Sequence, residues 1–168
     1  MVLLAGFEQL PTAVQPCQSC EVEQTIQITA PHTRVYNLLL NVANMPQWDP
    51  TISEVTHIRR NKYLVRTTTL GTLTFGLVGA IPYDRISWQI DGSFMQGVTF
   101  RVGLADKLAQ VDVMAKVSPT TAASQVEEII GLQLAALKQY AEYLANGGNP
   151  EAYKKSTDLM QGVGWIAT

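Results

Sequence analysis

The stretch ASQVEEIIGLQLAALKQYAEYLAN, from Ala123 to Asn146, decides the fold. Its apolar residues recur every three or four positions, which predicts an amphipathic helix of about 24 residues, roughly 36 Å long. The apolar stripe consists of Val126, Ile129, Ile130, Leu134, Ala136, Leu137, Tyr140, Ala141 and Leu144. Other parts of the chain must cover this stripe, because a helix that leaves such a face in water is not stable.

Both ends of this helix carry recognisable signals. Ser124, followed three residues later by Glu127, predicts a capping box at the start. Asn146-Gly147-Gly148 predicts a left-handed stop at the end.

The preceding chain is almost entirely of strand type. Residues 21–29 alternate apolar and polar side chains, and Pro31 then opens a short helix that is followed by a second, proline-broken turn at 44–50. Six further alternating runs have short connections, which predicts an antiparallel meander. These runs cover residues 51–59, 62–70, 72–80, 85–91, 97–104 and 108–117. The expected fold is α+β, with a curved antiparallel seven-stranded sheet wrapped around the long C-terminal helix and two short helices after the first strand.

Composition narrows the class of protein. The chain has 168 residues, of which 46% are hydrophobic and 15% charged, and its formal net charge is −2. Scattered basic residues argue against nucleic acid as the main partner. No apolar run reaches the ~18 residues of a membrane span, and the N-terminal residues lack the basic region of a signal peptide. We therefore expect a cytoplasmic protein without an integral membrane span.

Three regions of the chain are distinguished by pattern. Residues 1–20 are expected to form an irregular leader, 21–146 the folded domain, and 147–168 a tail with a possible short helix at 151–161, capped by Asn149. The leader carries Cys17 and Cys20 as a single C-x-x-C. A zinc site needs about four ligands, so these thiols are expected to be inert, although a disulfide or an interchain contact stays open. No metal ion and no cofactor are expected.

Three short motifs carry a resemblance to a known family. They are T-I-Q-I-T-A-P-x-x-x-V-Y-x-L-L at 25–39, M-P-Q-W-D-P at 45–50 and Y-D-R-I-S-W-Q at 83–89. In the order of elements given above, they resemble the START-like (SRPBCC) superfamily and its polyketide cyclase/dehydrase and lipid-transport group. The resemblance covers residues 21–146 and implies a helix-grip fold with a deep, mostly apolar cavity.

The resemblance implies a ligand class but no shared catalytic motif. We expect binding or transport of a hydrophobic small molecule or lipid in the cavity. A polyketide cyclase or dehydrase using the same cavity is the first alternative, and a module that binds a protein partner is the second. Ligand identity, catalysis and the oligomeric state stay open, and no catalytic residue is assigned.

Alternation along the strands selects the residues that face the helix. A pocket of ~300–1,000 Å³ lined by them would suit a hydrophobic ligand, whereas solid packing would make them an ordinary core. Trp48 and Gln133 stand out, since Trp48 precedes the meander and Gln133 interrupts the apolar stripe. A buried amide needs a partner, so Gln133 is expected to contact either a ligand or a polar neighbour. The candidate cavity residues are Trp48, Phe75, Leu77, Ile86, Trp88, Ile90, Val98, Phe100, Val111, Val113, Ile130, Gln133 and Leu137.

Overall fold

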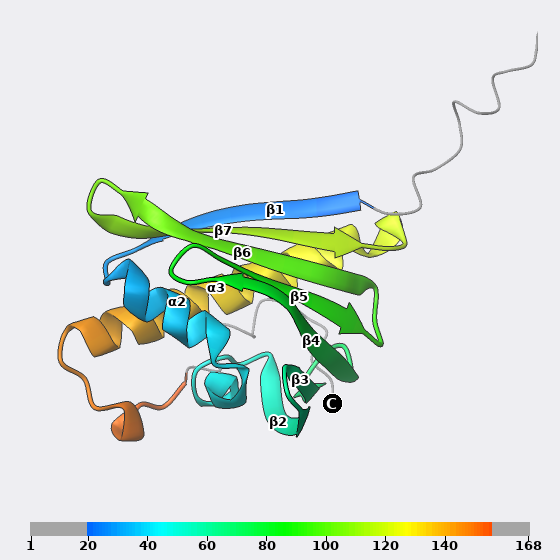
Figure 1. Ribbon diagram of the computed structural model, residues 1–168, viewed down its shortest axis with the longest axis horizontal. Helices are drawn as coiled ribbons and strands as arrows, with labels where there is room; N and C mark the ends of the chain where they lie inside the picture. Colours follow the sequence, from blue (N-terminus) through cyan, green and yellow to red (C-terminus); the bar gives the residue numbers. More distant parts are fainter. Residues whose placement is uncertain (1–19, 156–168) are drawn as a thin grey trace, which may run out of the picture.

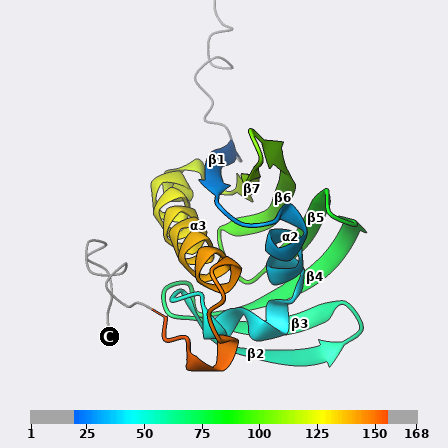
Figure 2. The same ribbon diagram turned by 90° about the vertical axis from the view of Figure 1, so that its left-hand side faces the viewer.

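A computed structural model describes residues 20–155 and shows one antiparallel sheet curved around one long helix (Figures 1 and 2). The strand order across the sheet is β1-β7-β6-β5-β4-β3-β2. Strands β2 to β7 form a meander, and β1 pairs with β7 at one edge. The strands are β1 (Cys20–Ile28), β2 (Ile52–Arg59), β3 (Lys62–Thr67), β4 (Thr72–Ile81), β5 (Arg85–Asp91), β6 (Met95–Ala105) and β7 (Leu108–Val117).

The helices lie on the concave side of this sheet. Figure 2 shows α3 (Ala123–Ala145) beside β1, and α2 (His32–Leu40) facing the middle strands. The short 3₁₀ helices are η2 (Val42–Gln47), η3 (Thr120–Ala122) and η4 (Pro150–Ala152). The predicted α+β architecture, with seven strands, two short helices after the first strand and a long C-terminal helix, is confirmed.

The strands bury alternate residues, as their patterns predict. In β5 and β6, Ile86, Trp88 and Phe100 face the interior with exposures of 3% or less, while their neighbours in sequence are less buried. Val65 on β3 and Val111 on β7 complete the same face and are fully buried. The concave face of the sheet therefore supplies one wall of the core, and α3 supplies the other.

Polar contacts fasten α3 to the edge strand β1. The Gln24 amide donates to the carbonyl of Glu127 at 2.6 Å, and the Thr29 amide donates to the Glu142 carboxylate at 2.8 Å. Lys138 donates to Glu142 at 2.7 Å, one helical turn away. The contacts of Gln24 and Thr29 join α3 to the first strand and the residue that follows it, while burial of the apolar stripe determines which residues of α3 face the sheet.

The start of α3 differs from the prediction. Ala122 occupies the N-cap position and makes no side-chain capping bond, so the predicted capping box of Ser124 and Glu127 is wrong. The reason is that η3 runs directly into α3, which places Ser124 inside continuous helical backbone. The predicted stop is confirmed, because Gly147 adopts a φ of 88° and its amide donates to the carbonyl of Leu144 at 3.1 Å.

The turn between β3 and β4 begins earlier than predicted. The Thr67 hydroxyl donates to the Gly71 carbonyl at 2.6 Å and accepts from the Leu70 amide at 2.8 Å. These side-chain bonds replace ladder bonds, so β3 ends at Thr67 rather than at residue 70. Gly71 has a φ of 76°, which suits glycine at the turn.

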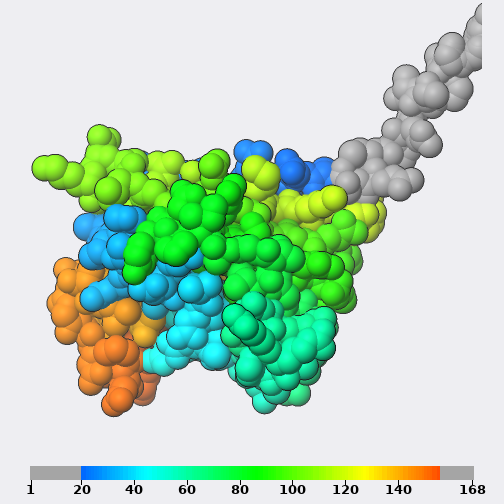
Figure 3. All heavy atoms as spheres, viewed as in Figure 1, coloured from blue at the N-terminus to red at the C-terminus, as the bar shows by residue number. Residues whose placement is uncertain are grey.

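The segment after α3 packs back onto the domain. Asn149 caps η4, because its side-chain oxygen accepts from the backbone amide of Glu151 at 3.0 Å. The ring of Tyr153 packs against those of Tyr140 and Tyr143, with distances between ring centroids of 4.6 and 4.9 Å. The Gln47 side chain donates to a carbonyl of η4. On the face seen in Figure 3, this orange segment lies beside the cyan η2. A helix was predicted for residues 151–161. Between residues 150 and 155, the structure has only the short turn Pro150–Ala152. The predicted leader, apart from Cys20 in β1, and residues 156–168 lie outside the described residues.

Candidate functional site

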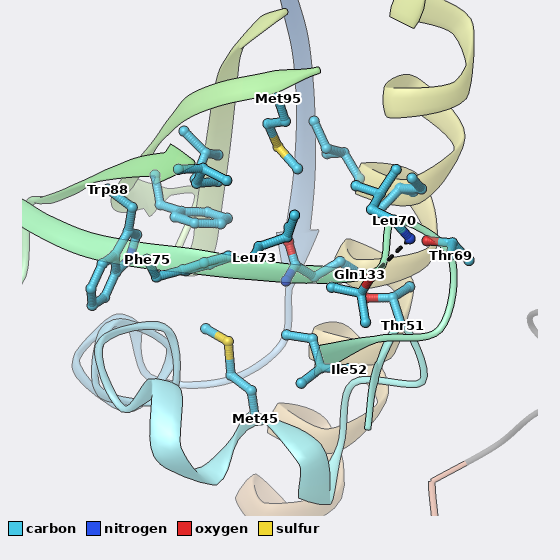
Figure 4. A pocket seen from close by; sticks show the side chains of 16 residues that line it. Met45, Thr51, Ile52, Thr69, Leu70, Leu73, Phe75, Trp88, Met95 and Gln133 are labelled. Carbon is cyan, nitrogen blue, oxygen red and sulfur yellow. Dashed lines mark hydrogen bonds between the residues drawn. The ribbon is translucent and has the colours of Figure 1, made fainter. Parts of the chain in front are cut away.

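A pocket lies between the concave face of the sheet, η2 and α3 (Figure 4). Figure 4 places Trp88 and Phe75 at one side, Thr69 and Leu70 at the other, and Gln133 between them. The lining residues are Met45, Thr51, Ile52, Thr67, Thr69, Leu70, Leu73, Phe75, Trp88, Ile90, Met95, Val98, Phe100, Ile129, Ile130 and Gln133.

The pocket is nearly closed in this structure. Its cavity volume is only about 30 Å³. Pockets that hold drug-sized ligands measure ~300–1,000 Å³, so the predicted volume is not open in this form. A ligand larger than a few atoms would require the lining side chains to move apart.

The predicted cavity residues divide into two groups. Those that line the pocket are Phe75, Trp88, Ile90, Val98, Phe100, Ile130 and Gln133. Those that lie elsewhere are Trp48, Leu77, Ile86, Val111, Val113 and Leu137. Most of the second group are fully buried because α2 packs on α3, β5, β6 and β7 and covers that end of the concave face. Leu77 is half-buried.

Sequence reasoning missed most of the lining residues outside the strands. Met45 lies in η2, which has no periodic pattern, and Thr51 lies directly before β2. Ile52 is the first residue of β2. Thr69 and Leu70 come from the turn after β3, beyond the point where alternation ends. For Met45 and Thr51, the one sequence signal was their position at the proline-broken turn that precedes the meander.

Gln133 finds a polar neighbour that the sequence did not identify. Its amide nitrogen donates to Oδ2 of Asp49 at 2.7 Å. Asp49 is 0% exposed, and its Oδ1 accepts from both the amide nitrogen of Thr51, at 2.9 Å, and the Thr51 hydroxyl, at 2.6 Å. Gln133 was expected to contact either a ligand or a polar neighbour, and the polar neighbour is present. Since Gln133 also lines the pocket, the ligand contact is still a prediction.

Lys155 contacts the backbone beside the Asp49 carboxylate. Its ammonium group donates to the backbone carbonyls of Asp49 and Ile52, at 3.2 and 3.1 Å. Burial lowers the pKa of Lys155, and the nearby Asp49 partly opposes that effect. The C-terminal segment thus holds the backbone that carries the buried carboxylate.

The stability of the protein should depend on the ionisation of Asp49. Burial raises the pKa of Asp49 above its ordinary value of 3.8, although hydrogen bonds from Thr51 and Gln133 and the charge of Lys155 lower it in part. A raised folded-state pKa contributes stability that is present below the ordinary value and lost as pH rises through the folded-state pKa. Urea unfolding at a series of pH values should therefore show that the wild type loses stability relative to Asp49→Asn as pH rises from about 4. Parallel pH profiles for the two proteins would contradict this expectation.

Two buried polar atoms of the pocket residues lack hydrogen-bond partners within residues 20–155. They are Nε1 of Trp88 and the hydroxyl of Thr69. Trp88 is 3% exposed and contacts the rings of Phe75 and Tyr63 at 6.0 and 6.2 Å. A third such atom, Nε1 of Trp48, lies outside the pocket. Unpaired buried polar groups are uncommon and costly, so the two at this mainly apolar pocket favour a polar ligand atom there.

Other kinds of site find little support in the described part of the chain. No group of three or more His, Cys, Asp or Glu side chains there could hold a metal ion. Within the same residues, no helix has the length and hydropathy needed to cross a bilayer.

The fold is that of a helix-grip protein, with the pocket between its sheet and its long helix. The sequence model of one family, described as "Polyketide cyclase / dehydrase and lipid transport", matches residues 19–142. The chain belongs to this family. No curated protein matches its sequence.

Solved structures share the architecture at low sequence identity. XoxI from Bacillus cereus is 17% identical with a TM-score of 0.65, over 74% of this chain and 96% of that one. The aromatase/cyclase Zhui from Streptomyces sp. R1128 is 17% identical with a TM-score of 0.64, over 78% and 99%. A START superfamily protein from Mycobacterium smegmatis is 17% identical with a TM-score of 0.60, over 74% and 98%. At these identities the likeness shows the fold alone.

Proposed function

We propose that this protein binds a hydrophobic small molecule or lipid that carries a polar group, in the pocket between the sheet and α3. The observation that carries the proposal is the pair of unpaired polar atoms, Nε1 of Trp88 and the Thr69 hydroxyl, at a pocket lined mainly by apolar side chains. Apolar burial would supply most of the affinity, at about 25 cal/mol per Å². A cytoplasmic location belongs to the same proposal.

Binding requires the pocket to widen, and its lining contains the side chains that suit such a change. Met45 and Met95 lie on opposite sides of the pocket in Figure 4, and methionine has a flexible, unbranched side chain. Leu70 lies in the turn between β3 and β4 rather than in a strand. Movement of these three side chains would enlarge the pocket without breaking the sheet.

A fluorescence titration tests this proposal. We expect the wild type to bind an anilinonaphthalene sulfonate probe saturably, because the apolar pocket excludes water from the dye. Val98→Phe adds bulk to the pocket lining and should weaken binding about tenfold or more, whereas Val78→Phe, at a position 64% exposed, should leave it unchanged. Thermal unfolding would check that each variant is folded, since added core volume costs about 1–3 kcal/mol. Equal binding by wild type and Val98→Phe, or no binding at all, would contradict the proposal.

A cyclase- or dehydrase-like activity is the second candidate. The buried Asp49 carboxylate, linked through Gln133 to the pocket, favours it, because ionisable groups in unusual environments cluster at active sites. Asp49 does not itself line the pocket, so Gln133 would position the substrate. Loss of turnover of a polyketide-like substrate in folded Gln133→Leu would support this candidate, and unchanged turnover would count against it.

A further inference from the structure

The amide group of Gln133 is held in one orientation by its neighbours. Oδ2 of Asp49 accepts a hydrogen bond from the NH₂ end of Gln133, at 2.7 Å, so the amide nitrogen of Gln133 is turned towards Asp49. The other carboxylate oxygen is already occupied by the amide and hydroxyl of Thr51. Asp49 is fully buried, so water does not compete for these positions.

The carbonyl oxygen of Gln133 is the end left for the pocket. It accepts no hydrogen bond from the residues between 20 and 155, while the side chain lines the pocket. Figure 4 shows Gln133 reaching from α3 in among the other lining side chains. A carbonyl oxygen in this place recognises a hydrogen-bond donor on a ligand.

We infer that Asp49 fixes the Gln133 amide with its carbonyl oxygen towards the pocket, so that the preferred ligand is an apolar molecule bearing a hydroxyl group. This inference rests on the proposed function and adds the chemical class of the ligand. A hydroxyl group can also accept a hydrogen bond, so it is compatible with the unpaired N–H of Trp88. Asp49 acts here as a positioning residue, because it reaches the ligand only through Gln133.

Replacing Asp49 by asparagine should reverse this orientation. The side-chain oxygen of asparagine can still accept from the amide and hydroxyl of Thr51, which leaves its NH₂ group facing Gln133. Gln133 must then turn its carbonyl oxygen to this NH₂ group and its own NH₂ group to the pocket. The variant would consequently prefer a ligand that accepts a hydrogen bond.

The test compares two probes that share one skeleton. 2-Naphthol offers a donor, whereas 2-methoxynaphthalene offers only an acceptor, and NMR titration of each measures both affinities. We expect the wild type to bind 2-naphthol about fivefold or more tightly than 2-methoxynaphthalene, and Asp49→Asn to lose or invert that ratio. Asp84→Asn makes the same chemical change at an exposed turn and should keep the wild-type ratio.

The outcomes separate this inference from the proposed function. If the wild type binds both probes equally in the pocket, the inference is wrong while the proposed function stands. An unchanged ratio in folded Asp49→Asn would also overturn the inference. If the wild type binds neither probe, both fail. If Asp49→Asn does not fold, the wild-type ratio still tests the preference for a hydroxyl group.

Discussion

Replacing Asp49 by alanine should lower the free energy of unfolding by about 2–4 kcal/mol at neutral pH. The substitution removes the acceptor of three hydrogen bonds at a position that is 0% exposed. The amide and hydroxyl of Thr51 and the NH₂ group of Gln133 would then lack partners, and each such group costs roughly 1–3 kcal/mol. Relief of the buried carboxylate's own desolvation offsets part of this loss, which keeps the expected total below the simple sum.

Asp49→Asn is the matched control for this loss. It keeps an oxygen for Thr51 and a polar group for Gln133, so its unfolding free energy should stay closer to that of the wild type. Denaturant unfolding at pH 7 would measure both variants. Equal stability of the alanine and asparagine variants would show that the hydrogen bonds around Asp49 do not support the fold.

Replacing Leu137 by alanine should cost about 2–5 kcal/mol of unfolding free energy. Leu137 is 0% exposed and does not line the pocket, so it belongs to the packed core on the inner face of α3. Truncation would lose the transfer free energy of the side chain and leave a cavity that the surrounding strands and α2 cannot fill completely.

Leu77→Ala provides the comparison. The side chain of Leu77 is only half-buried on β4, so its truncation should cost clearly less than that of Leu137. Thermal or denaturant unfolding of both variants tests this order. A loss at Leu77 as large as that at Leu137 would contradict the placement of Leu137 in the core.

The sequence contained enough information to predict the fold because periodicity records which face of an element is buried. Ile86, Trp88 and Ile90 alternate with polar residues and were predicted to face inward, and they do. The helix Ala123–Ala145 followed from its apolar stripe and its glycine stop. The predicted capping box failed because the short turn η3, which has no periodic pattern, leads into the helix.

The site was predictable only in part, since alternation tells inside from outside but not cavity from core. Ile130 and Leu137 occupy the same stripe of α3, yet only Ile130 lines the pocket. What separates them is the placement of α2 over one end of the sheet. The role of Asp49 was similarly hidden, because an Asp between a tryptophan and a proline looks like a turn residue until the fold brings it to Gln133, 84 positions away.

The central claim is that a hydrophobic ligand enters the pocket between the sheet and α3. The most direct test is an NMR titration of protein with labelled Ile, Leu and Val methyl groups, using 2-naphthol as the ligand. We predict saturable chemical-shift changes at Leu73, Ile90 and Ile130, which line the pocket. The methyl groups of Ile58 and Leu64, which are 48% and 40% exposed, should not change. Changes confined to those exposed residues, or none anywhere, would contradict the claim and favour a filled core.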